Sequence, residues 1–244
     1  MMNFLIVFSV FVVAANAAHL PSDVPRCKME DSHCLQNAIG EGIRIMKDGN
    51  PKINLSPLEP LRINELSIDQ GGNSSVSIQL KILNCDMHGF SQIKVSDVES
   101  FSSERVDWRI KALVPRVELD GDFTSKGRIL LFPITGKGKC NLTLVDLDIT
   151  AALRSGEPVT KNNKQYYTIE NVELKFQPKR MYLTFNNPDQ DRLLEDQTNR
   201  FLNENWKDLF EELKPSFQDS FSALFKEIAA RVFDRVPIKD MFLK

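Results

Sequence analysis

The sequence predicts an α+β protein, elongated rather than spherical, in which antiparallel strands lie around one long C-terminal helix. Two patterns support this fold class. The chain between residues 61 and 185 is a succession of short apolar segments with no helical pattern between them, and residues 191–233 carry a helical apolar stripe. A short amphipathic helix over about residues 35–46 precedes the strands.

Composition and charge exclude several classes of protein. The chain has 244 residues, of which 42% are hydrophobic and 26% charged, and this is enough for a sizeable buried core. Its 31 basic and 33 acidic residues give a net charge of −2, so no basic excess indicates nucleic-acid binding. Four cysteines are too few for a disulfide scaffold, so packing must supply most of the stability.

The N-terminal segment, residues 1–17, predicts a secretory signal peptide. Residues 4–13 carry no charge, and Ala15 and Ala17 are the small residues that signal peptidase requires, which places the cut after Ala17. The apolar run is too short to cross about 30 Å of hydrocarbon. We therefore expect a secreted, extracellular protein whose mature chain, residues 18–244, is a single domain.

Export permits disulfides, and the cysteines form an early and a late pair. Cys27 and Cys34 are expected to form a bridge that tethers the new N-terminus to the first helix, because a metal site that uses His33 lacks a second pair of ligands. For Cys85 and Cys140, strand alternation points the first outward and the second inward. A bridge between them would need a bulge, and the sequence is compatible with a bridge or with two free thiols. We predict no metal and no cofactor.

Two sequons predict glycosylation, at Asn73 and at Asn141, in an exported chain. The first follows Gly71 and Gly72, which mark a turn. A third match, at Asn54, is followed by proline, and we do not expect it to be used.

The predicted N-terminal helix has one apolar face. Leu35, Ile39, Ile43 and Met46 recur at intervals of four, four and three residues, and Gly49 supplies a stop. A proline-rich connector over residues 51–60 follows.

Beyond the connector, segments rich in β-branched, leucine and phenylalanine residues end at Gly, Asn, Pro or Asp, which is typical of strands joined by tight turns. Because no helical segment separates them, we expect an antiparallel meander. The predicted strands are 76–83, 91–95, 106–114, 117–123, 127–132, 138–148, 166–176 and 179–185.

The C-terminal apolar stripe crosses Pro215 without losing phase, so we predict one kinked helix over residues 191–233. Its members are Phe210, Leu213, Phe217, Phe221, Leu224, Ile228 and Val232. Such a helix is about 65 Å long, whereas a sphere of this mass is only about 45 Å across. The protein is therefore expected to be elongated with the strands along the helix; the alternative is two helices broken at Pro215.

The space between a curled sheet and a helix is filled either by side chains or by a bound ligand. The 16 phenylalanines, against three tyrosines and two tryptophans, predict an apolar interior. Burying a chain of about 12 to 16 carbons contributes roughly 10 to 13 kcal/mol, against an association cost of about 4 kcal/mol upward. A tunnel could therefore bind an apolar molecule without any recognisable binding motif.

Several motifs, in order along the mature chain, resemble the insect takeout and juvenile-hormone-binding protein family. They are the spaced pair Cys27 and Cys34, residues 56–61 (SPLEPL), Val114 with Pro115, residues 131–138 (LFPITGKG), residues 201–206 (FLNENW), residues 213–215 (LKP) and residues 236–242 (VPIKDMF). The resemblance implies a strongly curved antiparallel sheet wrapped around a long C-terminal helix, as in the wider tubular lipid-binding superfamily. It also implies the bridge between Cys27 and Cys34.

The resemblance further implies a secreted carrier of a small hydrophobic molecule, such as juvenile hormone, another terpenoid or a fatty-acid-like compound. Hormone carriers of this family have a second bridge later in the chain. No cysteine follows Cys140, which favours the takeout-like branch. Members of that branch are associated with feeding, circadian output, chemosensation and male behaviour.

The candidate ligand-lining residues are apolar positions of the predicted strands and helix, and ordinary core packing is the alternative role for each. They are Leu80, Ile82, Phe132, Leu142, Leu144, Tyr166, Phe176, Phe201, Phe210, Phe217, Phe221 and Leu224. With Tyr167 and Tyr182, Tyr166 supplies the phenols that could hydrogen-bond a polar head of the ligand.

An enzyme and a docking module are the two rival interpretations. The histidines are His19, His33 and His88, and the chain has neither a phosphate-binding glycine loop nor a zinc-protease motif, so we expect no catalytic residue. A docking module would have a packed interior, hold no stable ligand and bind a membrane or a receptor. A carrier would also contact a membrane or receptor transiently. The sequence specifies no oligomeric state.

Overall fold

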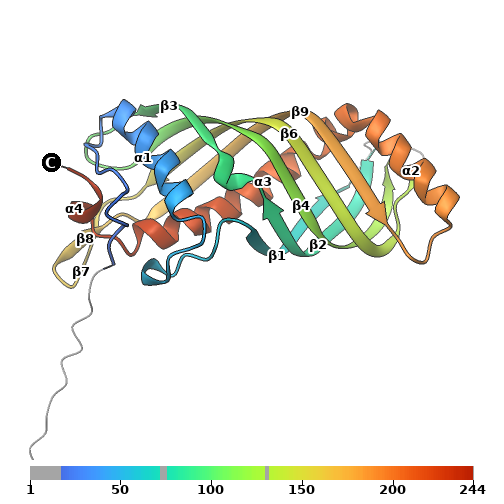
Figure 1. Ribbon diagram of the computed structural model, residues 1–244, viewed down its shortest axis with the longest axis horizontal. Helices are drawn as coiled ribbons and strands as arrows, with labels where there is room; N and C mark the ends of the chain where they lie inside the picture. Colours follow the sequence, from blue (N-terminus) through green and yellow to red (C-terminus); the bar gives the residue numbers. More distant parts are fainter. Residues whose placement is uncertain (1–17, 72–75, 130–131, 244) are drawn as a thin grey trace, which may run out of the picture.

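One antiparallel sheet and one long helix, α3, lie side by side along most of the length of the molecule (Figure 1). The computed structural model describes residues 18–71, 76–129 and 132–243, so the predicted signal peptide and Asn73 lie outside the described residues. The helices are α1 (Ser32–Ile45), α2 (Arg192–Glu204), α3 (Trp206–Phe233) and α4 (Ile238–Met241), with short 3₁₀ turns η1 (Pro51–Ile53) and η2 (Phe90–Gln92). The strands are β1 (Leu61–Gln70), β2 (Val76–His88), β3 (Lys94–Ser100), β4 (Asp107–Ile129), β5 (Phe132–Pro133), β6 (Gly136–Ser155), β7 (Val159–Lys161), β8 (Lys164–Tyr166) and β9 (Ile169–Asn186).

The main sheet is the antiparallel meander that the turn signals predict. Its order is β1-β2-β4-β6-β9, and every pairing is antiparallel. Strand β3 pairs with the first half of β4 and β2 with the second half, so β2 and β3 lie end to end along one edge of β4. Strands β7 and β8 form a separate hairpin.

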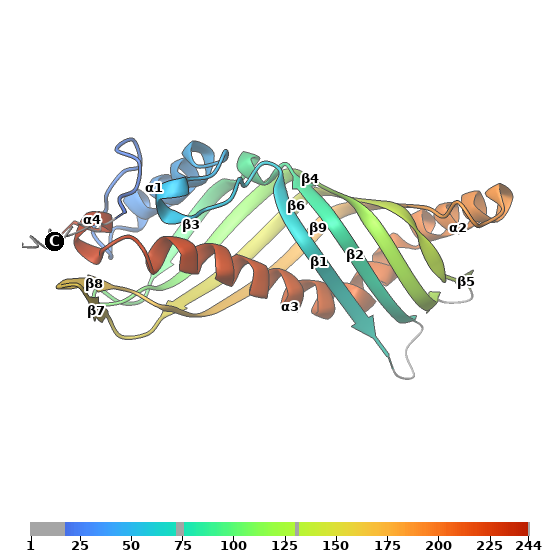
Figure 2. The ribbon, with the colours of Figure 1, turned by 90° about the horizontal axis from the view of Figure 1, so that it is seen from below.

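The sheet curls until α3 bridges its two edges (Figure 2). Two serines that are two positions apart in α3 show this directly. The Ser220 hydroxyl donates to the carbonyl oxygen of Ser67 in β1 at 3.1 Å, and the Ser222 hydroxyl accepts from the backbone N–H of Leu174 in β9 at 2.9 Å. The predicted curved sheet around a long C-terminal helix, with a short helix before it, is therefore confirmed.

Three predicted strand breaks are wrong. The segments predicted as 106–114, 117–123 and 127–132 are largely the single strand β4, and those predicted as 166–176 and 179–185 are largely β9. Pro115 fits inside β4 because the ladder with β6 is irregular opposite it, at Asp146, whose φ is 48°. Pro178 fits because β9 is an edge strand, where a missing N–H costs little.

The C-terminal helix continues through Pro215, as the unbroken stripe predicts, but it does not begin at residue 191. A break at Asn205 separates α2 from α3. Asn205 has φ −104° and ψ 21°, and its side-chain amide donates to the carbonyl oxygen of Phe201 at 2.9 Å. A side chain that bonds a carbonyl one turn back competes with the backbone ladder and favours such an end. Within the part of the chain described, no helix combines the length and apolar character needed to cross a bilayer.

Candidate functional site

An apolar cavity of about 290 Å³ lies between α1, the sheet and the second half of α3. Helices α1, α3 and α4 and strands β3, β4, β6 and β9 contribute side chains to its wall. The lining residues are Leu20, Val24, Pro25, Cys27, Leu35, Ala38, Ile39, Gly42, Ile43, Met46, Leu58, Phe90, Ile93, Val95, Trp108, Ile110, Ala112, Ile149, Ala151, Leu153, Val172, Leu174, Phe225, Ile228, Ala229, Val232, Phe233, Met241 and Phe242.

The size of the side chains explains why the interior is hollow at this end. Around the first half of α3 the space is filled by aromatic side chains. The centroid of the Phe176 ring lies 6.1 Å from that of Phe210 and 5.9 Å from that of Phe221, and all three residues are buried. Around the second half, small residues face one another. They are Ala38 and Gly42 of α1, Ala112 of β4, Ala151 of β6 and Ala229 of α3.

Helix α1 forms one side of the cavity with the face that the sequence predicts. Leu35, Ile39, Ile43 and Met46 all line the wall. The helix begins where the Asp31 carboxylate accepts from the backbone N–H of Cys34 at 3.0 Å, as an N-cap does.

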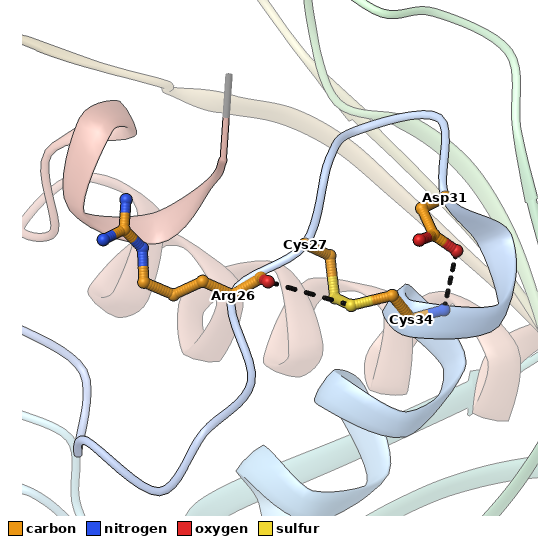
Figure 3. The surroundings of a disulfide bond; sticks show 4 residues. All are labelled: Arg26, Cys27, Asp31 and Cys34. Atoms are coloured by element: carbon orange, nitrogen blue, oxygen red, sulfur yellow. Dashed lines mark hydrogen bonds between the residues drawn. A yellow bond between two sulfur atoms is a disulfide. The ribbon is translucent and has the colours of Figure 1, made fainter.

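The predicted bridge between Cys27 and Cys34 is present and anchors α1 (Figure 3). Cys27 lines the cavity, and its carbonyl oxygen accepts from the backbone N–H of Leu243 at 2.8 Å. The Arg26 guanidinium donates to the carbonyl oxygen of Phe242 at 2.9 Å. The disulfide, the first residues that the structure describes and the C-terminal residues therefore close one end of the cavity together.

The Glu59 carboxylate, which does not line the cavity, fixes the backbone on either side of the lining residue Phe90. Phe90 in η2 stacks on Phe225 of α3 with ring centroids 4.9 Å apart. The Glu59 carboxylate accepts from the backbone N–H groups of Gly89 at 2.8 Å and Ser91 at 3.0 Å, on either side of Phe90. Burial alone raises the pKa of Glu59, but these hydrogen bonds outweigh it and hold the pKa below its usual value.

Among the described residues that line the wall, none has a charged side chain, and Trp108 is the one whose side chain contains a nitrogen or oxygen atom. Such a surface binds hydrocarbon by excluding water from it. A more polar groove of about 660 Å³ lies on the neighbouring side, between β1 and α3. It shares Leu58 and Ile228 with the cavity, and Arg62, Glu65, Glu227 and Arg231 lie along it.

Of the twelve residues predicted to contact a ligand, none of the eleven whose side chains the structure describes lines this cavity. Leu80, Ile82, Leu142, Leu144, Tyr166, Phe176, Phe210, Phe217 and Phe221 are buried, Phe201 is half-buried, and Leu224 is half-buried beside the polar groove. The side chain of Phe132 lies outside the described residues. The structure brings Phe176, Phe210 and Phe221 together as core. Ligand contact at all twelve stays a prediction.

The three phenols also lie away from this cavity wall. The Tyr167 hydroxyl donates to the carbonyl oxygen of Glu104. The Arg180 guanidinium lies over the ring of Tyr182, which is exposed. Tyr166 is buried in β8.

Cys85 and Cys140 are free and buried. A bulge between Leu83 and Asp86, where Asn84 has φ 50°, reverses the alternation of β2, so Cys85 faces inward rather than outward. The two thiols still do not meet, because β4 lies between their strands. Strands two places apart are separated by about 10 Å, and disulfides need Cα atoms within about 7 Å. Burial raises the pKa of Cys85 to about 11 and that of Cys140 to about 12.

The Asn141 sequon lies within β6 rather than in a turn. Its side chain is half-buried, and its amide nitrogen, the atom that a glycan would occupy, donates to the Asp120 carboxylate at 2.9 Å. Glycosylation at Asn141 stays a prediction. Among the described residues, no three His, Cys, Asp or Glu side chains gather as a metal site would require.

Part of the cavity could have been found from the sequence. The apolar face of α1 and the positions Ile228 and Val232 of the helical stripe were recognised, and only their role was missed. The small residues Ala112, Ala151 and Ala229 carry no such signal, because they meet only through the tertiary fold.

Comparisons with known proteins agree with this geometry. The family model described as "Haemolymph juvenile hormone binding protein (JHBP)" matches residues 5–243. The circadian clock-controlled protein daywake of Drosophila melanogaster is 24% identical over 231 residues, covering 92% of this chain and 88% of its own, and the Drosophila yakuba protein of the same name is 22% identical over 230 residues, covering 91% and 88%.

Among solved structures, Takeout 1 of Epiphyas postvittana superposes with a TM-score of 0.77 at 22% identity, covering 90% of this chain and 99% of that protein. This likeness shows the same fold. The family match extends over nearly the whole sequence, from before α1 to the end of α4. The chain belongs to the haemolymph juvenile hormone binding protein family.

Proposed function

We propose that the protein is a secreted carrier that binds one small hydrophobic molecule in the cavity between α1, the sheet and α3. The observation that carries this proposal is a cavity of about 290 Å³ whose described lining residues are apolar apart from Trp108, the one among them with a side-chain nitrogen. This volume lies at the lower end of the range for ligand pockets, about 300 to 1,000 Å³. The family name and the takeout fold support the same class of function.

The energetics favour a molecule inside the cavity. An empty apolar void lowers stability by about 24 cal/mol per Å³, which for this volume is several kcal/mol. That is a large share of the roughly 5 to 15 kcal/mol by which a domain is stable. Burying about ten methylenes contributes about 8 kcal/mol, which exceeds an association cost of about 4 kcal/mol.

Secretion is part of the proposal. Export by a signal peptide is supported by the uncharged run over residues 4–13 and by the small residues Ala15 and Ala17 that follow it. The disulfide between Cys27 and Cys34 is consistent with an oxidising compartment.

The test is uptake of apolar probes by delipidated protein and by two variants of α3. Ala229→Phe places a ring in the cavity, whereas Ala223→Phe places the same ring at an exposed position that lines only the polar groove. We expect saturable one-to-one uptake of a long-chain ketone, an ester or a terpenoid by the wild-type protein. Ala229→Phe should lower the affinity at least about tenfold, the equivalent of 1.4 kcal/mol, and Ala223→Phe should leave it unchanged.

Two outcomes would count against the carrier. Uptake that is equal in the Ala229→Phe and wild-type proteins would mean that ligand does not occupy this cavity. Binding to phospholipid vesicles without uptake of any probe would favour the docking module instead. Thermal unfolding of each variant confirms that it folds.

A further inference from the structure

The polar groove between β1 and α3 shares part of its wall with the apolar cavity. The groove has a volume of about 660 Å³ and lies along the second half of α3. Leu58, which is 3% exposed, and the half-buried Ile228 line both the groove and the cavity. At these two positions, one layer of side chains separates the groove from the cavity.

The polar groove changes in character from its exposed residues to its buried residues. Its exposed side chains include Arg62, Glu65 and Glu227, which are charged, whereas Leu58 and Leu66 are buried. An apolar molecule that moves inward therefore passes from hydrated, charged side chains to hydrocarbon that is shielded from water. This order suits a passage between solvent and the cavity.

Hydrogen bonds fasten α3 at the two ends of the groove. At one end the Ser220 hydroxyl donates to the carbonyl oxygen of Ser67, and at the other the Arg231 guanidinium donates to the carbonyl oxygen of Asn54 at 3.1 Å. Among the described residues, no hydrogen bond or ion pair joins residues 221–230 of α3 to β1. Ser220 and Arg231 are roughly 16 Å apart along the helix axis. Over that length, side-chain packing alone holds the seam between α3 and β1.

The α1 side of the cavity is held by stronger ties. The disulfide between Cys27 and Cys34 joins α1 to the preceding chain. The side-chain amide of Gln36 in α1 donates to the carbonyl oxygen of Val95 in β3 at 3.0 Å. Local opening is easiest where the fewest bonds must break, which favours the seam between α3 and β1.

We propose that the polar groove is the entrance to the cavity. Leu58 and Ile228 form its gate, and the hydrogen bond from Arg231 to the loop at Asn54 holds the gate closed. The proposal rests on the proposed function, since it assigns the path that a ligand takes into the carrier. An entrance residue that does not touch the bound ligand changes the association and dissociation rates by the same factor, because the affinity is their ratio.

Two substitutions outside the cavity wall should shift these rates in opposite directions. Arg231→Met keeps an apolar stem but removes the hydrogen bond to Asn54, so both rates should rise about 3- to 10-fold. Ala223→Phe narrows the groove with a ring, so both rates should fall at least about threefold. Neither substitution should change the dissociation constant. The matched controls are Arg235→Met and Lys226→Phe, at exposed positions that line neither space, and they should leave both rates unchanged.

Stopped-flow fluorescence measures these rates. Mixing with the apolar fluorophore phenylnaphthylamine gives association, and displacement by excess long-chain ketone gives dissociation. Rates equal to wild type in both variants, or a change in only one of the two rate constants, would overturn the entrance, and saturable uptake would leave the carrier standing. Faster rates only after reduction of the bridge between Cys27 and Cys34 would place the entrance under α1 instead.

Two further controls keep the entrance and the carrier distinguishable. No uptake of either compound by the wild-type protein would reject the carrier and its entrance together. Thermal unfolding shows whether each variant folds, and because the two variants act at separate positions, either one alone decides the outcome.

Discussion

The side-chain amide of Asn203 closes two hydrogen bonds with the backbone of one residue, Leu183. Its oxygen accepts from the Leu183 N–H at 3.0 Å, and its nitrogen donates to the Leu183 carbonyl oxygen at 2.6 Å. One turn earlier in α2, Asn199 makes the same pair of bonds with Phe185, both at 2.9 Å. Strand β9 is an edge strand, so these asparagines take the place of a neighbouring strand and cover an edge that could pair with another molecule.

Replacing Asn203 with alanine should destabilise the protein by about 1 to 3 kcal/mol, because two hydrogen bonds are lost. The free energy of unfolding in urea measures this. Gln197→Ala, an exposed position of the same helix, is the matched control and should change it by less than about 0.5 kcal/mol. Equal stability of the two variants would contradict the role assigned to the amide.

The hydrogen bonds of Glu59 should make stability depend on pH. The pKa of Glu59 is lower in the folded state, so its contribution is present above the usual carboxyl pKa of about 4.3 and is lost as the pH falls through the folded pKa. Glu59→Gln should therefore be less stable than wild type by about 1 kcal/mol at about pH 7. The gap should narrow as the pH falls from about 7 to about 3, the direction that the lowered pKa gives.

Urea unfolding of both proteins at the two pH values measures this gap. Glu157→Gln, at a largely exposed carboxylate, should show no comparable gap at either pH. A gap for Glu59→Gln that stays constant with pH would show that the carboxylate charge is not its source.

The thiols of Cys85 and Cys140 should not react in the folded protein. Burial raises their pKa to about 11 and about 12, so at about pH 8 at most about one thiol in a thousand is ionised, and only the thiolate is nucleophilic. Mass spectrometry after maleimide treatment should find no label on either residue in buffer and label on both in urea. Native labelling at the rate of free cysteine would contradict this expectation.

Removing the disulfide should loosen the end of the cavity that α1 covers. The paired substitution Cys27→Ser with Cys34→Ser should lower the free energy of unfolding by about 2.5 kcal/mol on the chain-entropy account. Amide hydrogen exchange in α1 should become faster than in β6. Reduction of the disulfide in the wild-type protein should lower the free energy of unfolding and speed exchange in α1 in the same way. Unchanged exchange in α1 would show that side-chain packing, without the disulfide, is enough to hold this helix in place.

The periodic patterns of the sequence predicted most of the secondary structure. The spacing of Leu35, Ile39 and Ile43 identified α1 and its buried face, and the stripe that crosses Pro215 correctly predicted a continuous helix there. Strand breaks at Pro115 and Pro178 were wrong, because a proline is tolerated opposite a bulge or on an edge strand, and neither condition can be seen before the strands are paired.

The site was harder to predict because it depends on volume rather than on pattern. The phenylalanines that looked most suited to a ligand, such as Phe210 and Phe221, fill the space themselves. The hollow arises where Ala112, Ala151 and Ala229 meet. The inward orientation of Cys85 was also not predicted. It depends on the left-handed backbone conformation of Asn84 at a bulge, and the alternation of apolar residues in the sequence does not reveal that bulge.

The segments that begin at residue 18 and end at residue 243 meet beside the cavity, and this has a practical consequence for anyone who handles this protein. His19 Nδ1 lies 3.5 Å from the Asp240 carboxylate, and the Leu243 N–H bonds the carbonyl of Cys27. A purification tag or fluorescent fusion attached directly before residue 18 or after the C-terminal residues would therefore lie at the pole that holds the cavity, where it would disturb a measurement of ligand uptake. An attachment point on the exposed side of α2, at the opposite pole, would avoid this interference (Figure 1).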